Sequence, residues 1–444
     1  MSLKITAKKY LAVKKAEIDL SGITVISGIN GSGKSTLANS TYKLLDKALN
    51  YSRIVDDEMA DNLLAFSQTL FSSGNTLSGI IPRNDAEKIS QSLFFSMVDR
   101  KKGLEDRRTT ILQTMEMMSQ SVKEIKTLKT EKQMTQYKAF ITLLSTLAGN
   151  KTAEGADIDT VFSDLRKKIE SLFTSSELMK SNRGIKVFQN SWKKDFRKAL
   201  NPMEFNVEEN DVPIIDAERN IVSLPDSVKN VVYMDSPMAF GEENSRRDHW
   251  NELNAFIKND KTFGPMFDYS TKEPLGILKG DFEWNKQKTS ITYKLPNGVS
   301  FDLFNNGATG LKSFTILQLL FREGFIGDKT LLIIDEPEAH LHPQWIVHFA
   351  RFIVLLRKAT GCSFLISSHS TDMVSSLKYI SEKELGRSAD FYMAEQSNDD
   401  EFEFEYRHLG DDIEPIFETF NKSFKVMDSY SGDPFNSSNC EENK

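Results

Sequence analysis

Cysteine is scarce in this 444-residue chain, and long apolar runs are missing from it. The two cysteines, Cys362 in an apolar run and Cys440 in the polar C-terminal stretch, are too few for a disulfide framework or a cysteine zinc site. No run of about 18 apolar residues could span a bilayer, and the first twenty residues contain no signal-peptide core. The sequence therefore predicts a cytoplasmic protein that makes no membrane contact.

Charge of one sign does not dominate either. The formal net charge is -7, with 27% charged and 39% hydrophobic residues, which is ordinary for a folded globular protein. This balance excludes a surface that is basic throughout, although a local basic groove stays open as a nucleic-acid site. The length allows either two lobes or one domain with a large insertion.

The first motif lies between a predicted strand and a predicted helix. Within residues 3–27, apolar and polar residues alternate in a pattern that predicts two short strands, and the β-branched run Ile23–Ile26 that follows predicts a buried strand. The following segment, GINGSGKS at 28–35, matches the pattern G-x-x-x-x-G-K-[ST] in full. Its backbone N–H groups and the helix N-terminus would face phosphates, and Lys34 would reach the β and γ oxygens.

This loop predicts a site for ATP and Mg²⁺. We expect Ser35 to hold the magnesium ion and Thr36 to lie next to the α-phosphate. A chance glycine turn is the alternative, but the flanking strand and helix argue against it. The predicted nucleotide-binding residues are Asn30, Gly31, Ser32, Gly33, Lys34, Ser35 and Thr36.

Two further strand ends carry polar side chains. The apolar run 331–334 ends in Asp335 and Glu336, where ligands of open α/β sheets bind. Asp335 would position magnesium and Glu336 would orient or deprotonate the attacking water, whereas a helix-capping pair is the alternative for this pattern alone. His369 follows the strand 363–367 and could sense the γ-phosphate, with a purely structural role as its alternative.

Between these motifs the pattern changes to long polar helices. Leu104, Ile111, Met118 and Ile125 are spaced seven apart, as in a coiled coil or helical bundle, and turn residues at 149–155 divide the stretch. Beyond it, residues 231–234 read as a strand and 282–303 as a hairpin around Pro296-Asn297-Gly298. We expect an ATPase head formed by residues 1–84 and 201–430, a helical insertion at 85–200 and a disordered tail at 431–444.

Taken together, these residues resemble the ABC-type ATPases, in particular the branch with SMC, RecF and OLD-like proteins. ISGINGSGKST is similar to their Walker A, LLIIDEP to their Walker B and SSHS to their H-loop. The resemblance implies an α/β fold, a P-loop NTPase with a mixed sheet and a helical, coiled-coil-like insertion. It implies Glu336, Lys34 and His369 as catalytic residues, and Ser35 and Asp335 as metal ligands.

The resemblance extends to a degenerate signature segment, NGATGLKS at 306–313. Thr309 and Gly310 align with the Ser-Gly of the family's LSGGQ, while Leu311 and Lys312 depart from its Gly-Gln. The implied assembly is a homo-oligomer in which Thr309 and Gly310 of one protomer face the γ-phosphate at Lys34 of the other. An ordinary helix start is the alternative.

The segment EPEAHLHP at 336–343 is typical of OLD-like and related defence ATPases, and its second half falls where the family has its D-loop. A set of metal ligands is a weaker alternative, because residues two apart cannot share a helical face. The Q-loop glutamine cannot be assigned, with Gln68 and Gln91 as candidates only.

Spacing narrows the type of ATPase. Walker A and Walker B lie about 300 residues apart, too far for a transporter domain and too near for the long arms of a true SMC protein. The roughly 75 residues after His369 leave little room for a Toprim nuclease. The chain thus resembles the stand-alone ATPases of bacterial anti-phage systems such as Septu, PARIS and retrons, which work with a separate effector, often a nuclease. The alternatives are a RecF-like DNA-binding repair ATPase and an ATP-dependent scaffold with little turnover.

A basic segment at 180–200 is the candidate for nucleic-acid contact, because clustered cations release counterions from phosphates. However, Trp192, Phe196 and Leu200 recur every four residues, which favours an amphipathic helix with a solvated basic face. The cations of the segment are Lys180, Arg183, Lys186, Lys193, Lys194, Arg197 and Lys198.

Overall fold

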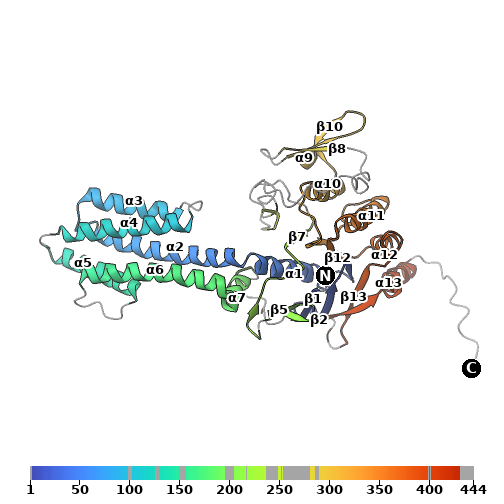
Figure 1. The fold of residues 1–444 in the computed structure, drawn as a ribbon, viewed down its shortest axis with the longest axis horizontal. Helices are drawn as coiled ribbons and strands as arrows, with labels where there is room; N and C mark the ends of the chain where they lie inside the picture. Colours follow the sequence, from blue (N-terminus) through green and yellow to red (C-terminus); the bar gives the residue numbers. More distant parts are fainter. Residues whose placement is uncertain are drawn as a thin grey trace, which may run out of the picture. The chain divides into compact units, whose positions relative to one another are not determined.

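The computed structural model describes residues 3–98, 103–125, 128, 130–149, 157–195, 205–216, 218–236, 249–251, 253, 281–285, 290–398, 400 and 402–430. The chain forms two compact units, one of Met1–Leu49 with Trp192–Lys444 and the other of Asn50–Ser191 (Figure 1). The first unit is an α/β domain that we call the ATPase unit. We call the second the helical unit, because its described elements are helices. The expected tail at 431–444 lies outside the described residues.

Within the described residues, the ATPase unit contains an 11-stranded mixed sheet in the order β6-β5-β4-β1-β2-β14-β13-β3-β12-β11-β7. Strands β13, β3, β12, β11 and β7 are parallel neighbours, whereas β1 pairs with β2 and β4 in antiparallel fashion. The strands are β1 (Leu3–Tyr10), β2 (Val13–Leu20), β3 (Ile23–Ser27), β4 (Phe205–Glu209), β5 (Val212–Asp216), β6 (Ile221–Val222), β7 (Asn230–Met234), β11 (Thr330–Asp335), β12 (Ser363–Ser368), β13 (Asp390–Gln396) and β14 (Phe404–Gly410).

Helices cover both faces of the parallel strands, which explains why β3 and β12 are buried at every position. Alternate strand residues, such as Ile334 and Phe364, pack with side chains of α10 (Thr309–Arg322), α11 (Pro343–Thr360), α12 (Thr371–Leu385) and α13 (Glu414–Tyr430) in one core, and these helices follow one another along the sheet (Figure 1). On the other face of the sheet, helix α1 (Lys34–Leu49) contacts β7, β11 and β12. The α/β fold with a mixed sheet is thus confirmed.

Because β3, β11, β12 and β7 are parallel, their carboxyl ends meet at one edge of the sheet. The glycine-rich loop follows β3, Glu336 follows β11 and His369 follows β12. Topology therefore brings together three motifs that are far apart in the sequence.

The predicted hairpin around Pro296-Asn297-Gly298 is confirmed. Its strands are β9 (Ser290–Lys294) and β10 (Ser300–Asp302), which with β8 (Asp281–Asn285) form a three-stranded sheet. Gly298 has φ +84° and donates its N–H to the carbonyl of Leu295 at 2.9 Å, so the turn uses the backbone freedom of glycine. The short helix α9 (Leu303–Asn306) follows it.

The helical unit begins at Asn50, not at residue 85, and ends at Ser191 instead of 200. Only Asn50 separates α1 from α2, so the polarity of the sequence shows no break there. The core of the unit contains Ile111 and Met118, with Leu104 and Ile125 packed against it, as the seven-residue spacing predicts. Its helices are α2 (Tyr51–Leu77), α3 (Arg83–Val98), α4 (Leu104–Lys123), α5 (Glu131–Ala148), α6 (Ile158–Asn182) and most of α7 (Ile185–Asp195).

No helix in the described part of the chain is long and apolar enough to cross a membrane.

Candidate nucleotide site

The glycine-rich loop is shaped by backbone conformations that need glycine. Gly31 and Gly33 have φ +83° and +88°, and a Cβ on Gly33 would come within 2.7 Å of Val13 Cγ2. Ser32 is buried, and its hydroxyl donates to the carbonyl of Ile29 at 2.8 Å. The Tyr406 hydroxyl donates to the Ser32 carbonyl at 3.1 Å, so a residue of β14 helps to hold the loop in place.

Lys34 is the first residue of α1, and its side chain is folded back into the loop. Its ammonium donates to the carbonyls of Gly28 and Ile29 at 2.8 and 2.9 Å, and the residue is only 4% exposed. Burial lowers the pKa of Lys34, and the negative charges of Glu336, Asp335 and Glu338 oppose that shift. The lysine therefore lies at the meeting point of the loop and the carboxylates.

Asp335 ends β11 and faces the start of α1. Its Oδ1 accepts hydrogen bonds from the Ser35 hydroxyl at 3.1 Å and from the Ser367 hydroxyl, and the Tyr233 hydroxyl lies 3.4 Å from its Oδ2. Burial raises the pKa of Asp335 despite the two serine hydrogen bonds, and the charges of Glu336 and Asp235 add to the rise. Adjacent hydroxyl and carboxylate oxygens are the hard donors that Mg²⁺ prefers, so this pair fits that ion.

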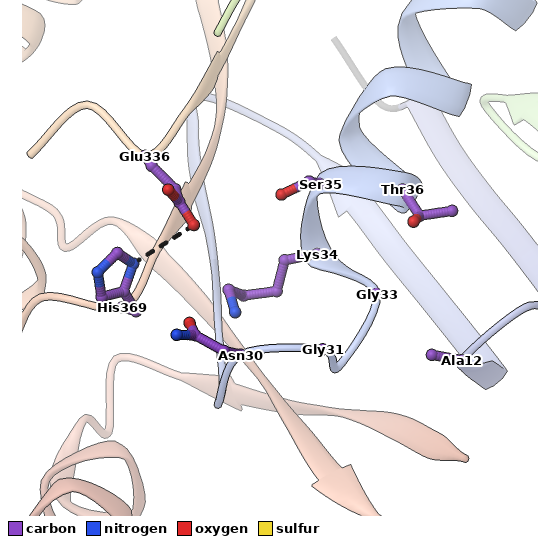
Figure 2. Close-up of a pocket in the computed structure, with 9 residues that line it drawn as sticks. All are labelled: Ala12, Asn30, Gly31, Gly33, Lys34, Ser35, Thr36, Glu336 and His369. Carbon is purple, nitrogen blue, oxygen red and sulfur yellow. Dashed lines mark ion pairs between the residues drawn. The ribbon is translucent and has the colours of Figure 1, made fainter. Parts of the chain in front are cut away.

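Glu336 has a strained backbone. Its φ is +49°, a region that costs a non-glycine residue about 1–2 kcal/mol. Its N–H donates to the Ser367 carbonyl at 3.0 Å, which fixes this conformation between β11 and β12. The side chain is 37% exposed and lines the cavity next to Lys34 (Figure 2).

His369 follows β12 and lines the same cavity. Its Nδ1 lies 3.6 Å from Glu336 Oε1 and 3.3 Å from Glu338 Oε1 (Figure 2 marks the pair with Glu336). The backbone N–H of His369 donates to Glu338 Oε1 at 2.8 Å. The histidine thus has two carboxylates on one side of its ring.

The cavity measures about 470 Å³, within the range of small-molecule sites. The lining joins predicted residues from all three motifs with Ala12, which the sequence did not indicate. Ser32 is turned into the loop, and Asp335 lies behind Ser35, where it also lines a smaller cavity with Asp235 and Ser313. The lining residues are Ala12, Asn30, Gly31, Gly33, Lys34, Ser35, Thr36, Glu336 and His369 (Figure 2).

Of the predicted signature residues, Gly310 is not among those that line this cavity. Thr309 opens α10, and the preceding Ala308 provides no side-chain cap. Gly310 is packed so tightly that a Cβ there would lie 2.2 Å from Leu341 Cδ2. Gln68 and Gln91, the two Q-loop candidates, belong to α2 and α3 of the helical unit.

His342 has a structural place. It is the N-cap of α11, where its Nδ1 accepts from the backbone N–H of Gln344 at 3.4 Å. Among the residues described, no group of three or more His, Cys, Asp and Glu side chains is arranged to hold a metal ion. The weaker prediction of a metal set in EAHLHP therefore finds no support.

The basic segment is partly engaged within the helical unit. Lys180 forms ion pairs with Asp56 at 2.8 Å and Glu177 at 2.9 Å, and the Arg183 guanidinium lies over the Tyr51 ring at 4.7 Å. Trp192 is buried, which agrees with an amphipathic helix. Phe196, Arg197, Lys198 and Leu200 lie outside the described residues.

A glycine-rich phosphate loop after one parallel strand and a carboxylate pair after another are the elements of a P-loop nucleotide site. The model of the AAA ATPase domain family matches residues 1–374. The chain belongs to the AAA ATPase domain family.

Other comparisons gave more distant likenesses. No curated protein matches the sequence. The SMC head domain from Thermotoga maritima is 13% identical with a TM-score of 0.28, and the match covers 46% of this chain and 65% of that one. The Smc head domain with an extended coiled coil from Pyrococcus furiosus, solved with the C-terminal domain of ScpA, is 10% identical with a TM-score of 0.32, covering 96% and 98%.

Proposed function

We propose that the chain binds ATP with Mg²⁺ and hydrolyses it. The observation that carries this proposal is the meeting of Lys34, Ser35, Glu336 and His369 around one cavity, from motifs that follow three different strands. Family membership supports the same reaction. Each of these side chains has a separate task.

The loop and Lys34 would bind the phosphates, since the backbone N–H groups and the N-terminus of α1 converge there. Ser35 and Asp335 would hold Mg²⁺, which neutralises charge on the phosphate oxygens. Glu336 would orient the attacking water or accept its proton, because its carboxylate lies at the cavity surface. His369 would donate to the γ-phosphate from the far side of the cavity.

We also propose that two copies assemble through a shared nucleotide, and the start of α10 supports this. The N-cap Ala308 has no side-chain acceptor, so the first N–H groups of this 14-residue helix stay available to an anion. In a homodimer, Thr309 and Gly310 would direct them at the γ-phosphate bound by the other protomer. Nucleotide binding would then control whether two copies associate.

The wider role we propose is control of a separate effector, a nuclease, in bacterial anti-phage defence. The support is the resemblance of EPEAHLHP at 336–343 to the segments of defence ATPases. Nucleic-acid contact through 180–200 gains no support, because Lys180 and Arg183 already contact Asp56 and Tyr51. We therefore rank the RecF-like repair function below the effector function.

The test is the solution mass and ATP turnover of Glu336→Gln, with and without ATP and Mg²⁺. We expect retained ATP binding, turnover reduced by about 100-fold or more, and an ATP-dependent doubling of the mass. Lys34→Ala is the matched control and should show neither binding nor the mass change. Normal turnover in Glu336→Gln would refute the role of Glu336, and an unchanged mass at saturating ATP would refute the clamp.

A further inference from the structure

Glu338 is a buried carboxylate that the proposed reaction does not use. It is 7% exposed, and burying a carboxylate is unfavourable unless hydrogen bonds replace its water. Those bonds come from the end of β12: the Ser368 hydroxyl donates to Oε1 at 2.9 Å and the backbone N–H of His369 donates at 2.8 Å. The segment after β11 is thereby fixed to the segment that carries His369.

Two polar atoms in this contact lack a hydrogen-bond partner among the described residues. Glu338 Oε2 and His369 Nδ1 are both shielded from solvent and unsatisfied. Nδ1 nevertheless lies 3.3 Å from Glu338 Oε1, so a small rotation of the ring would align an Nδ1–H donor with the carboxylate. Hydrogen bonds in catalytic sites often reach good alignment only in the substrate complex.

The neighbouring Glu336 is placed differently. Its carboxylate is 37% exposed and lines the cavity, whereas Glu338 is buried and does not line it. Two glutamates separated by one proline therefore face different surroundings. Glu336 can reach the reacting atoms, whereas the contacts of Glu338 connect it to His369.

We propose that Glu338 is a positioning residue that accepts the Nδ1 proton of His369 and thereby leaves Nε2 as the nitrogen that can donate to the nucleotide. The inference rests on the proposed function of His369 at the γ-phosphate. With Nδ1–H donated to Glu338, a proton on Nε2 makes the ring a cation, and the buried carboxylate provides the counter-charge while Nε2 donates to a phosphate oxygen.

The key variant is Glu338→Gln. Its amide oxygen can still accept from Ser368 and from the His369 backbone, so the fold is expected to hold. Nδ1 lies nearest to that same Oε1, so the amide oxygen can still accept from it, and the variant removes the charge of the carboxylate while keeping the acceptor. We expect kcat to fall by about 10- to 100-fold while KM stays within about threefold, as for other residues that orient a functional histidine. Glu384→Gln, which removes an exposed ion pair with Lys358, should leave kcat unchanged.

The direct measurement is the protonation pattern of His369 by ¹⁵N NMR on the full-length, histidine-labelled protein. The chain has six histidines, and the spectrum of His369→Gln identifies the signal. In the wild type we expect Nδ1 to carry a proton beside the one on Nε2, and in Glu338→Gln, which lacks the counter-charge, we expect the ring to carry a single proton. A wild-type spectrum with a bare Nδ1 overturns the proposal whether or not the variant folds.

Double substitution separates positioning from mere structural support. Glu338→Gln combined with His369→Gln should be no slower than His369→Gln alone, because both remove the same interaction. A further loss of rate in the double variant contradicts the proposal. If the wild type fails to hydrolyse ATP and Lys34→Ala changes nothing, the proposed function fails. The NMR pattern then decides the Glu338 contact by itself.

Discussion

The carboxyl edge of the sheet and the helical unit differ in how exposed their charged side chains are. At the edge, Lys34 and Glu338 are buried at 4% and 7% exposure. In the helical unit, the ion pair of Arg166 with Glu116 is about half exposed, and the core consists of apolar side chains such as Leu144. Buried charge is costly and exposed ion pairs contribute little, so the charges at the edge lower the stability of the fold and those of the helical unit add little to it.

The largest effect is expected from Lys34→Ala. It removes an ammonium whose position at the loop fits the phosphates, so ATP affinity should fall by at least about 100-fold, or ~2.7 kcal/mol. Calorimetric titration with ATP measures it, and Lys47→Ala near the end of α1 is the matched control. Equal affinity in the two variants would mean that the buried charge at the edge does not serve binding.

Leu144→Ala tests the helical unit. The side chain is fully buried in the core on α5, so its truncation should lower the free energy of unfolding of this unit by about 2–5 kcal/mol. Denaturant unfolding followed by circular dichroism measures the loss, and ATP affinity should not change. Leu178→Ala, at an exposed position on α6, should cost less than about 0.5 kcal/mol. A weakened nucleotide site in Leu144→Ala would remove the contrast between the units.

Glu336→Asn tests the strain at the edge. Asparagine tolerates the left-handed region better than glutamate or glutamine, so this variant should be more stable than Glu336→Gln by about 0.5–1 kcal/mol. Both variants lack the carboxylate, so both should lose turnover. Thermal unfolding in parallel gives the difference, and equal midpoints would show that the conformation at 336 is not strained.

The smallest effect is expected from Arg166→Ala, which removes an exposed ion pair with Glu116. The free energy of unfolding should fall by no more than about 0.5 kcal/mol. A double-mutant cycle with Glu116→Ala isolates the pair. A coupling energy above about 1 kcal/mol would show that surface charge stabilises the helical unit after all.

The motifs were predictable because their chemistry is local. The loop at 28–35 needs glycines next to Lys34, and Glu336 and His369 each follow an apolar run that reads as a strand. The hairpin at Gly298 and the seven-residue spacing of apolar residues from Leu104 to Ile125 are local patterns too, and both are confirmed. A sequence records such features directly, since the interacting residues are neighbours in the chain.

The contacts that complete the edge were not predictable in the same way. Tyr406 supports the loop from 374 residues away, and Tyr233 reaches Asp335 from a strand whose place in the sheet depends on long-range pairing. Strands β4, β5, β6, β13 and β14 were missed. The β4–β5 hairpin did carry a local signal, because Asn210 and Asp211 form its two-residue turn with φ +50° and +63°. The places of β13 and β14 in the sheet depend on pairing with β3 and β2, which are far away in the sequence. The sequence analysis placed the start of the helical unit at residue 85 and not at Asn50, because only one residue separates α1 from α2.

The contact of Gly310 with Leu341 has a mechanical consequence. Because glycine has no side chain, the first turn of α10 approaches the side chain of Leu341, in the turn after β11, more closely than another residue type would allow. A larger residue at 310 would have to displace Leu341 Cδ2, the flexible end of that side chain. A movement of the turn that carries Glu336 and Leu341 would therefore reach the start of α10 first.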